Sequence, residues 1–220
     1  MRGFAVAVAV AALALGAAPN DAARFAGAYI PGGALKLARL PTGALVAVGE
    51  RGTGFDRSWG SSLLYAEGTR APVELCDRVF YASHPLPLPS GEVAVERGVA
   101  GPSVPGRVRV DELTIDAVDV RTGRARTLLA TRGFEAHLAA LAGDEIVVYL
   151  VQPGVASLRA VNWRSGRERV ILPSLPPYAH DFAVVDGALV VHNRDDARPA
   201  LETVERIDLA DGTRTRLETR

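Results

Sequence analysis

A basic side chain recurs at one position in four stretches of the chain. His84, His137 and His180 each lie seven residues before a turn glycine or its neighbour, and Lys36 holds the equivalent place in the first stretch. If the stretches meet in the fold, these side chains form a ring that could bind an anion or a metal ion. The alternative is a repeated structural position, at which each histidine hydrogen-bonds to the neighbouring stretch.

Metal binding sets a strict distance requirement on such a ring. Zinc needs its ligand nitrogens at about 2.0–2.1 Å from one point, and strands of successive repeats lie too far apart to supply them. We therefore predict no metal and no cofactor, and interpret Lys36, His84, His137 and His180 as binding residues.

Motifs for catalysis are absent from the sequence. It has no G-x-S-x-G elbow, no H-E-x-x-H, no phosphate-binding Walker loop and no C-x-x-C. We therefore predict no catalytic residues.

Carboxylates near the C-terminal end leave an enzymatic alternative open. They are Asp181, Asp186, Asp195 and Asp196, and they lie close in sequence to His180 and His192. Carboxylates and imidazoles can hold a catalytic metal ion, as in a metal-dependent hydrolase or lactonase. The competing interpretation, which we favour, is a solvated loop with turn aspartates, in which Asp195 and Asp196 contribute to a binding surface.

A loop at 51–60 carries the best candidate for an exposed aromatic contact. Trp59 lies between Arg57 and Gly60 in the segment RGTGFDRSWG. Arg57 and Trp59 could contact a partner, whereas the alternative is that the Trp59 ring packs under its own loop.

The elements that would position these residues are short strands. The segment 137–172 contains an apolar run, the β-branched and aromatic run EIVVYLV, an alternating run, and RERVIL. Turn residues separate these runs, at Gly143-Asp144, at the QPG of 152–154, and at Ser165-Gly166. Four antiparallel strands joined by tight turns form one propeller blade.

Two turn signatures show that this unit is repeated. The first turn reads PTGALVAV at 41–48, PSGEVAV at 89–95, AGDEIVV at 142–148 and VDGALVV at 185–191. The glycines of the second turn are Gly68, Gly123, Gly166 and Gly212. Because the two series interleave in the same order, we predict an all-β fold of four four-stranded antiparallel blades, which would be an incomplete propeller if the ring does not close.

The repeats resemble the TolB-like family of β-propellers, and WD-type propellers more loosely. The segments that carry the resemblance are SGEVAV and DGALVV with AVDVRTGRARTLL, AVNWRSGRERVIL and RIDLADGTRTRL, within about residues 36–220. The S-P-D-G turn of the family is reduced here to PSG, AGD or VDG, and rings of the family usually hold more than four blades. The resemblance implies a propeller without specifying its function.

The N-terminal segment has the layout of a cleaved secretory signal. Arg2 precedes the apolar run FAVAVAVAALAL at 4–15, and small residues follow at 16–18. We predict that 1–18 is a signal peptide and that the protein is periplasmic or secreted. We expect a connector at 19–34, in which 25–30 could add a strand, and then the propeller repeats at 35–220. Their expected units lie near 36–83, 84–136, 137–179 and 180–220.

Composition excludes some partners. The 25 basic and 25 acidic residues balance, so the chain lacks the charge excess of proteins that bind nucleic acid or anionic membranes. A 12-residue apolar run is shorter than the roughly 20 residues of a membrane span. Cys76 is the one cysteine, so no internal disulfide can form.

Segments of variable length gather on one predicted face. They are 51–60, 97–111, 152–154 and 194–199, all between the second and third strands of a unit. Variable loops on a rigid scaffold commonly bind partners. We therefore expect an exported binding or scaffold protein that holds a protein or small ligand on this face. Unpaired edge strands in an open array would add a route to self-association.

Overall fold

The computed structural model describes residues 20–31, 33–51, 59–100, 110–132, 135–152, 155–175, 179–194 and 203–217. Regular structure in these ranges is β-strand, apart from one short 3-10 helix, η1 (Asp21–Phe25). None of the helices described there is long and apolar enough to cross a membrane.

The strands form four groups in chain order. The first group is β1 (Leu35–Arg39), β2 (Leu45–Glu50), β3 (Ser61–Ala66) and β4 (Val73–Val79). The second is β5 (Leu86–Pro87), β6 (Glu92–Ala100), β7 (Val110–Asp119) and β8 (Ala125–Arg132). The third is β9 (Glu135–Ala142), β10 (Glu145–Gln152), β11 (Val155–Asn162) and β12 (Glu168–Leu175). The fourth is β13 (Ala179–Val185), β14 (Ala188–Arg194), β15 (Thr203–Asp208) and β16 (Arg214–Leu217).

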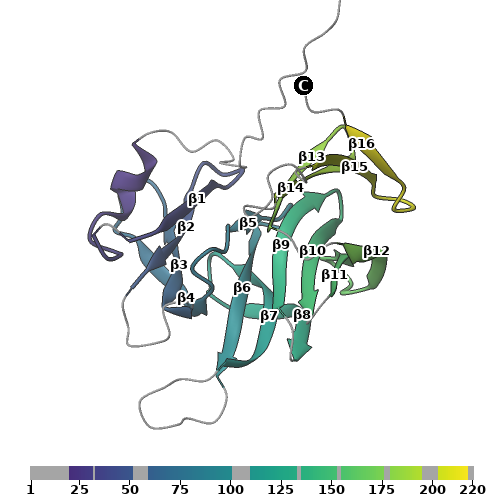
Figure 1. Cartoon of the computed structure of the whole chain (residues 1–220). Helices are drawn as coiled ribbons and strands as arrows, with labels where there is room; N and C mark the ends of the chain where they lie inside the picture. The colour runs from purple at the N-terminus through teal and green to yellow at the C-terminus, as the bar shows by residue number, and fades with distance from the viewer. Residues whose placement is uncertain are drawn as a thin grey trace, which may run out of the picture.

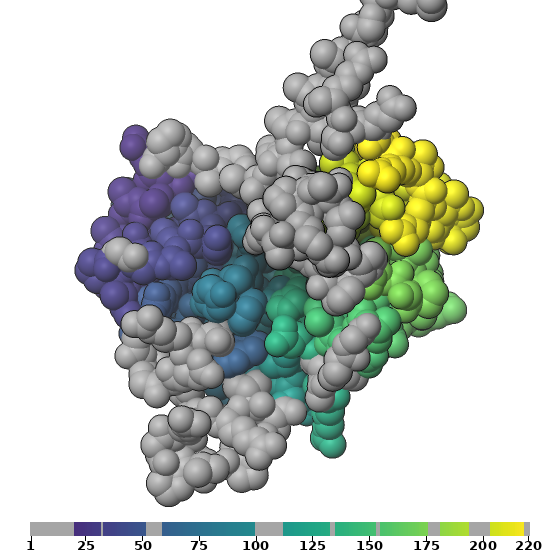
Figure 2. All heavy atoms as spheres, viewed as in Figure 1, coloured from purple at the N-terminus to yellow at the C-terminus, as the bar shows by residue number. Residues whose placement is uncertain are grey.

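Each group is an antiparallel sheet whose strands pair with their neighbours in sequence, and we refer to the groups as blades 1 to 4. The blades succeed one another around the molecule, from β1 to β16 in Figure 1 and from purple to yellow in Figure 2. This arrangement is an incomplete β-propeller and confirms the predicted fold class.

Blades 1 and 2 are joined more closely than the repeat pattern predicts. The pair Val79 and Arg97 links β4 to β6, so the two blades form one continuous sheet. Strand β5 pairs with β6 over two residues alone. Pro85 directly precedes β5 and Pro87 lies within it. Proline has no N–H to donate to a strand ladder. The proline-rich sequence therefore shortens the innermost strand of blade 2.

The segment 97–111 differs from its predicted role as an exposed loop. Strand β6 continues to Ala100, and β7 already begins at Val110. Paired residues along this extension include Arg97 with Thr114 and Val99 with Glu112. The Gly and Pro residues that suggested a loop lie mainly in 101–109, outside the described ranges.

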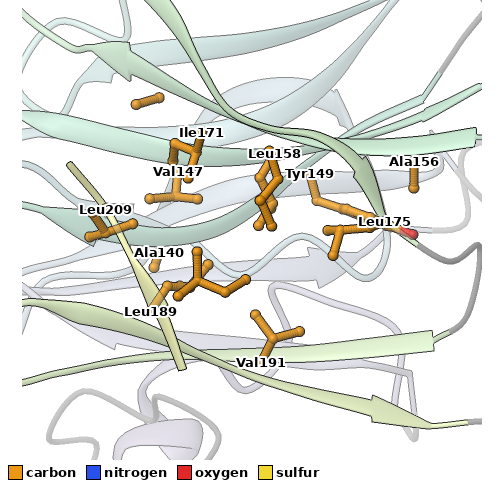
Figure 3. Close-up of a cluster of buried hydrophobic side chains, with 13 residues drawn as sticks. Ala140, Val147, Tyr149, Ala156, Leu158, Ile171, Leu175, Leu189, Val191 and Leu209 are labelled. Carbon is orange, nitrogen blue, oxygen red and sulfur yellow. The ribbon is translucent and has the colours of Figure 1, made fainter. Parts of the chain in front are cut away.

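The core lies between the faces of successive blades. Strand β10 is buried from Ile146 to Leu150, and its side chains alternate between two clusters. Ile146 and Val148 pack toward blade 2, whereas Val147 packs toward Leu189 and Val191 of blade 4 (Figure 3). The run Ile146 to Leu150 of this middle strand is therefore apolar at every position, because a neighbouring blade covers each face.

A different element covers the outer face of blade 1. Phe25, at the end of η1, is fully buried against a face formed by Leu45, Ala47, Leu64 and Ala66. The segment 25–30 thus forms a helix end and turns instead of the expected extra strand. The guanidinium of Arg39 holds η1 in place through Asp21, with Nη2 2.6 Å from Oδ2.

Self-association through unpaired edge strands stays a prediction. Within the described residues the sheets end at β1 and β8, at β9 and β12, and at β13 and β16. The outer face of blade 1 is covered by η1.

The glycine in the second turn of a blade can allow a close contact with the neighbouring blade, in addition to forming the turn. Gly212 has φ of +76°, and a Cβ there would overlap the carbonyl oxygen of Ile171 on blade 3. Gly123 approaches the Leu75 carbonyl in the same way, with a Cβ position 3.1 Å from the oxygen. Gly166 has a similar φ of +72° but no atom within 4 Å of its Cβ position.

We expect Gly212→Ala to destabilise the protein more than Gly166→Ala. Both substitutions force an L-residue into left-handed backbone, at about 1–2 kcal/mol, but Gly212→Ala also pushes blade 4 away from blade 3. Urea unfolding of the two variants measures the difference. Equal urea midpoints for the two variants would show that a side chain at position 212 does not clash with the Ile171 carbonyl.

Candidate functional site on the loop face

The basic residues of the repeat lie at one end of the blades. Lys36 pairs with Val48 and His137 with Tyr149, in each case toward the loop between the second and third strands. His180 lies on β13, paired in register with Asn193. His84 lies two residues before β5. We call this end of the molecule the loop face, and the opposite end the turn face.

The structure does not place every predicted site residue. Arg57, Asp195 and Asp196 lie outside the described residues. Among those that are described, the structure brings Trp59 close to His137, through residues that the sequence interpretation did not single out.

His137 is held between two carboxylates. Its Nδ1 lies 3.2 Å from Oε2 of Glu96, and its Nε2 lies 3.1 Å from Oε2 of Glu135. Burial opposes a charge on the ring, but hydrogen bonds and charges from Glu96 and Glu135 outweigh it and raise the pKa of His137. The histidine therefore hydrogen-bonds to the neighbouring blade, as the structural alternative predicted.

Glu96 is the buried partner in this arrangement. Its side chain is 6 % exposed, and Oε1 accepts a hydrogen bond of 2.7 Å from the backbone N–H of Leu138 on blade 3. Its own N–H donates to Oγ of Ser83 at 3.1 Å. Glu96 therefore connects blade 2 to blade 3 through a side chain. A charged residue directly after the buried run Val93–Val95 was the sequence signal for it.

The next residue along β6 makes the corresponding link to blade 1. Arg97 Nη1 donates to Asp116 at 3.0 Å, and Nε donates to the carbonyl oxygen of Asp77 on β4 at 3.1 Å. The Asp116 side chain is almost fully buried and also accepts from Thr127. Because adjacent residues of a strand point to opposite faces, Glu96 and Arg97 tie blade 2 to both of its neighbours.

An aromatic cluster covers His137. The ring centroid of Phe80 lies 5.3 Å from His137, 5.1 Å from Trp59 and 4.9 Å from Tyr81. Trp59 is half-buried against Phe80, so its ring packs on the link between blades 1 and 2. Tyr81 is 47 % exposed and is the aromatic side chain of the cluster most available to a partner.

Lys36 and His84 form a second, weaker feature of the loop face. Desolvation and the ammonium of Lys36 lower the pKa of His84. The two basic groups of blades 1 and 2 are therefore close enough to repel, and His84 favours its neutral form.

Neither a metal centre nor a reactive thiol is found in the described ranges. No group of three or more His, Cys, Asp and Glu side chains there could hold a metal ion. Cys76 is half-buried in the core between blades 1 and 2. Burial raises the pKa of its thiol to about 11, which keeps it protonated and poorly nucleophilic.

Two grooves between blades lie on the turn face, away from the predicted site residues. One, of about 470 Å³, runs between Tyr65, Glu74 and the turn at Arg121–Gly123. The other, of about 490 Å³, lies between the Glu145–Arg169 ion pair and the Asp208–Ala210 turn. Both follow blade boundaries.

Solved structures supply the comparison for this fold. A puromycin hydrolase variant matches over 84 % of this chain and 28 % of its own, with 18 % identity and a TM-score of 0.60. TolB from Acinetobacter baumannii matches over 84 % and 41 %, with 12 % identity and a TM-score of 0.53.

The fold is a TolB-like β-propeller. An oligogalacturonate lyase in complex with manganese matches over 82 % of this chain and 51 % of its own, at 13 % identity and a TM-score of 0.60. This chain thus spans about a quarter to a half of these relatives. No protein-family model matches the sequence. Curated proteins give no match either.

We expect Arg97→Ala to be strongly destabilising, because it leaves the buried carboxylate of Asp116 without its ion-pair partner. Breaking a buried pair in this way costs about 3 kcal/mol. Arg132→Ala is the matched control, since that side chain is 84 % exposed and its Nε lies 3.8 Å from Glu112. Such a pair contributes less than about 1 kcal/mol. Similar unfolding free energies for the two variants would contradict the role assigned to Arg97.

Proposed function

We propose that this protein is an exported binding or scaffold propeller that holds a protein or small ligand on its loop face and has no catalytic activity of its own. The observation that carries the proposal is the cluster of Trp59, Phe80, Tyr81 and His137, assembled from blade 1, the link between blades 1 and 2, and blade 3. Such a site exists only when the blades are packed.

The cluster combines side chains that are held in place with side chains that are exposed at its edge. Glu96 hydrogen-bonds to Nδ1 of His137, and the ring of Phe80 packs against the imidazole. Tyr81, at 47 % exposure, and Glu135, whose side chain is 65 % exposed, are open to solvent. Aromatic rings on a rigid support are typical anchors of binding interfaces, because little side-chain entropy is lost on binding.

Lys36 and His84 are close enough for the ammonium to lower the pKa of His84, and His180 lies on the inner strand of blade 4. Arg57, Asp195 and Asp196, which we also propose as binding residues, lie outside the described residues. The proposed ligand contacts Tyr81 and Glu135.

Export rests on the sequence of residues 1–18, which lie outside the described ranges. We expect the mature protein to lack the first 16–18 residues, because the charged start, apolar run and small residues occur in the order that signal peptidase requires. N-terminal sequencing of the protein from its native host provides the measurement. Intact Met1 on cytoplasmic material would contradict export.

We expect Tyr81→Ala and Trp59→Ala to lose the partners captured from a periplasmic or secreted extract, whereas Val170→Ala retains them. Val170 is 54 % exposed on the outermost strand of blade 3 and serves as a control of equal accessibility. The captured species, once purified, is titrated against each variant. Unchanged affinity in both aromatic variants would place the site elsewhere.

Metal analysis of the same preparations separates binding from the metal-dependent hydrolase or lactonase alternative. A binding propeller is expected to contain no stoichiometric divalent ion. A bound ion that disappears in both His137→Ala and His180→Ala would contradict the non-catalytic proposal.

A further inference from the structure

The position of His137 imposes a condition on its protonation. Both ring nitrogens face carboxylate oxygens, at 3.2 Å to Glu96 and 3.1 Å to Glu135. A neutral imidazole has one N–H and can donate to one of them, whereas the imidazolium donates to both. This geometry therefore fits the charged ring.

We propose that Glu96 and His137 form a protonation-dependent latch between blades 2 and 3 that positions the aromatic cluster of the loop face. The latch is closed when His137 donates to Glu96 and Glu135, and it opens when the ring loses a proton. Its effect on ligand affinity rests on the proposed function, but the latch itself does not.

Glu96 is the fixed half of the latch. Its backbone N–H is bonded to Ser83, its backbone carbonyl accepts from Phe80 N–H at 3.0 Å, and Oε1 accepts from Leu138. When His137 becomes neutral, either Oε2 of Glu96 or the carboxylate of Glu135 faces a nitrogen lone pair. The neutral ring therefore keeps a hydrogen bond to one carboxylate and loses the other, and with one bond in place of two it is freer to move.

The ring of Phe80 transmits that movement to the surface. Phe80 contacts His137 on one side and Trp59 and Tyr81 on the others. A shift of the imidazole therefore changes the support of the two aromatic side chains that we place in the binding site. Glu96 is a positioning residue, since it acts through His137 and Phe80.

Two further titratable side chains, Tyr149 and His84, have shifted pKa values. Tyr149, opposite His137 on β10, has its pKa raised by burial and stays neutral. His84 has a lowered pKa, so it is neutral where His137 is still charged. On blade 4, whose strand β13 packs on β9, Asp181 of β13 lies 3.8 Å from Nδ1 of His192 on β14.

The direction of the pH effect follows from the raised pKa of His137. The latch stabilises the folded state fully below the unfolded histidine pKa of about 6.5. That contribution is lost as the pH rises through the folded pKa. The latch is thus closed below the unfolded pKa and opens as the pH rises through the folded pKa of His137.

The test follows His137 and Trp59 in the full-length protein without ligand. NMR titration of the histidine rings is expected to show His137 with an apparent pKa above about 6.5. The emission of Trp59, obtained as the difference between wild type and Trp59→Phe, is expected to shift over the same pH range. Glu96→Gln should lower the pKa of His137 and weaken the shift, and His137→Asn should abolish the shift.

Two controls make the outcome decisive. Glu135→Gln, at a mostly exposed position, should reduce the pKa of His137 less than Glu96→Gln, and His84→Gln should leave the Trp59 shift unchanged. A His137 that titrates below about 6.5 in the wild type overturns the latch even if Glu96→Gln fails to fold. A Trp59 shift that persists in His137→Asn overturns it as well.

The latch and the proposed function fail in different ways. If Trp59 responds to pH as expected but Tyr81→Ala and Trp59→Ala keep their partners, the latch stands and the binding site is wrong. If the aromatic variants lose their partners while His137→Asn retains the pH-dependent emission, the binding site stands and the latch is wrong.

Discussion

The structure depends on the burial of both faces of its blades. Strands β2 and β10 are buried along nearly their whole length, and the side chains of β10 divide alternately between two clusters. A single blade would expose one or both of these apolar faces to water, so no blade is expected to be stable alone. At blade 1, where no preceding blade is described, Phe25 of η1 covers the face instead.

Face-to-face packing also determines where polar side chains can act. The buried clusters between blades are apolar, and polar side chains link the blades at a few positions beside them. At the loop face, Glu96 and Arg97 point to opposite sides of β6 and connect blade 2 with blades 3 and 1. At the turn face, Gly212 allows the blade 4 turn to approach the carbonyl of Ile171. The alignment of the loop-face cluster is thus a consequence of how the blades are joined.

Repeated features of the fold could be predicted from the sequence, and features found in one blade could not. Turn glycines such as Gly68 and Gly166 recur with positive φ, which the repeated turn pattern predicts. The shortness of β5 depends on the prolines of blade 2, and η1 occurs once. Strand β6 continues past the residues that suggested a loop, because pairing with β7 extends to Ala100.

The candidate site was predictable in part, for a similar reason. The register of His137 is visible in the repeat, and its place at the loop end of β9 follows from it. Its partners are Glu96 and Phe80, which are distant in sequence and occupy no repeated position. Their contact with His137 arises from the docking of one blade on another, which single-sequence patterns do not encode. Trp59 was selected as exposed, but its ring packs on Phe80.

Amide hydrogen exchange at Leu138 tests the joining of the blades most directly. Its N–H lies on the innermost strand of blade 3 and donates to the side chain of Glu96 on blade 2. If the blades are held as described, this amide exchanges as slowly as the ladder amides of β10. Exchange as fast as that of an exposed turn would show that Glu96 does not join the two blades, and would contradict the account of the loop-face site.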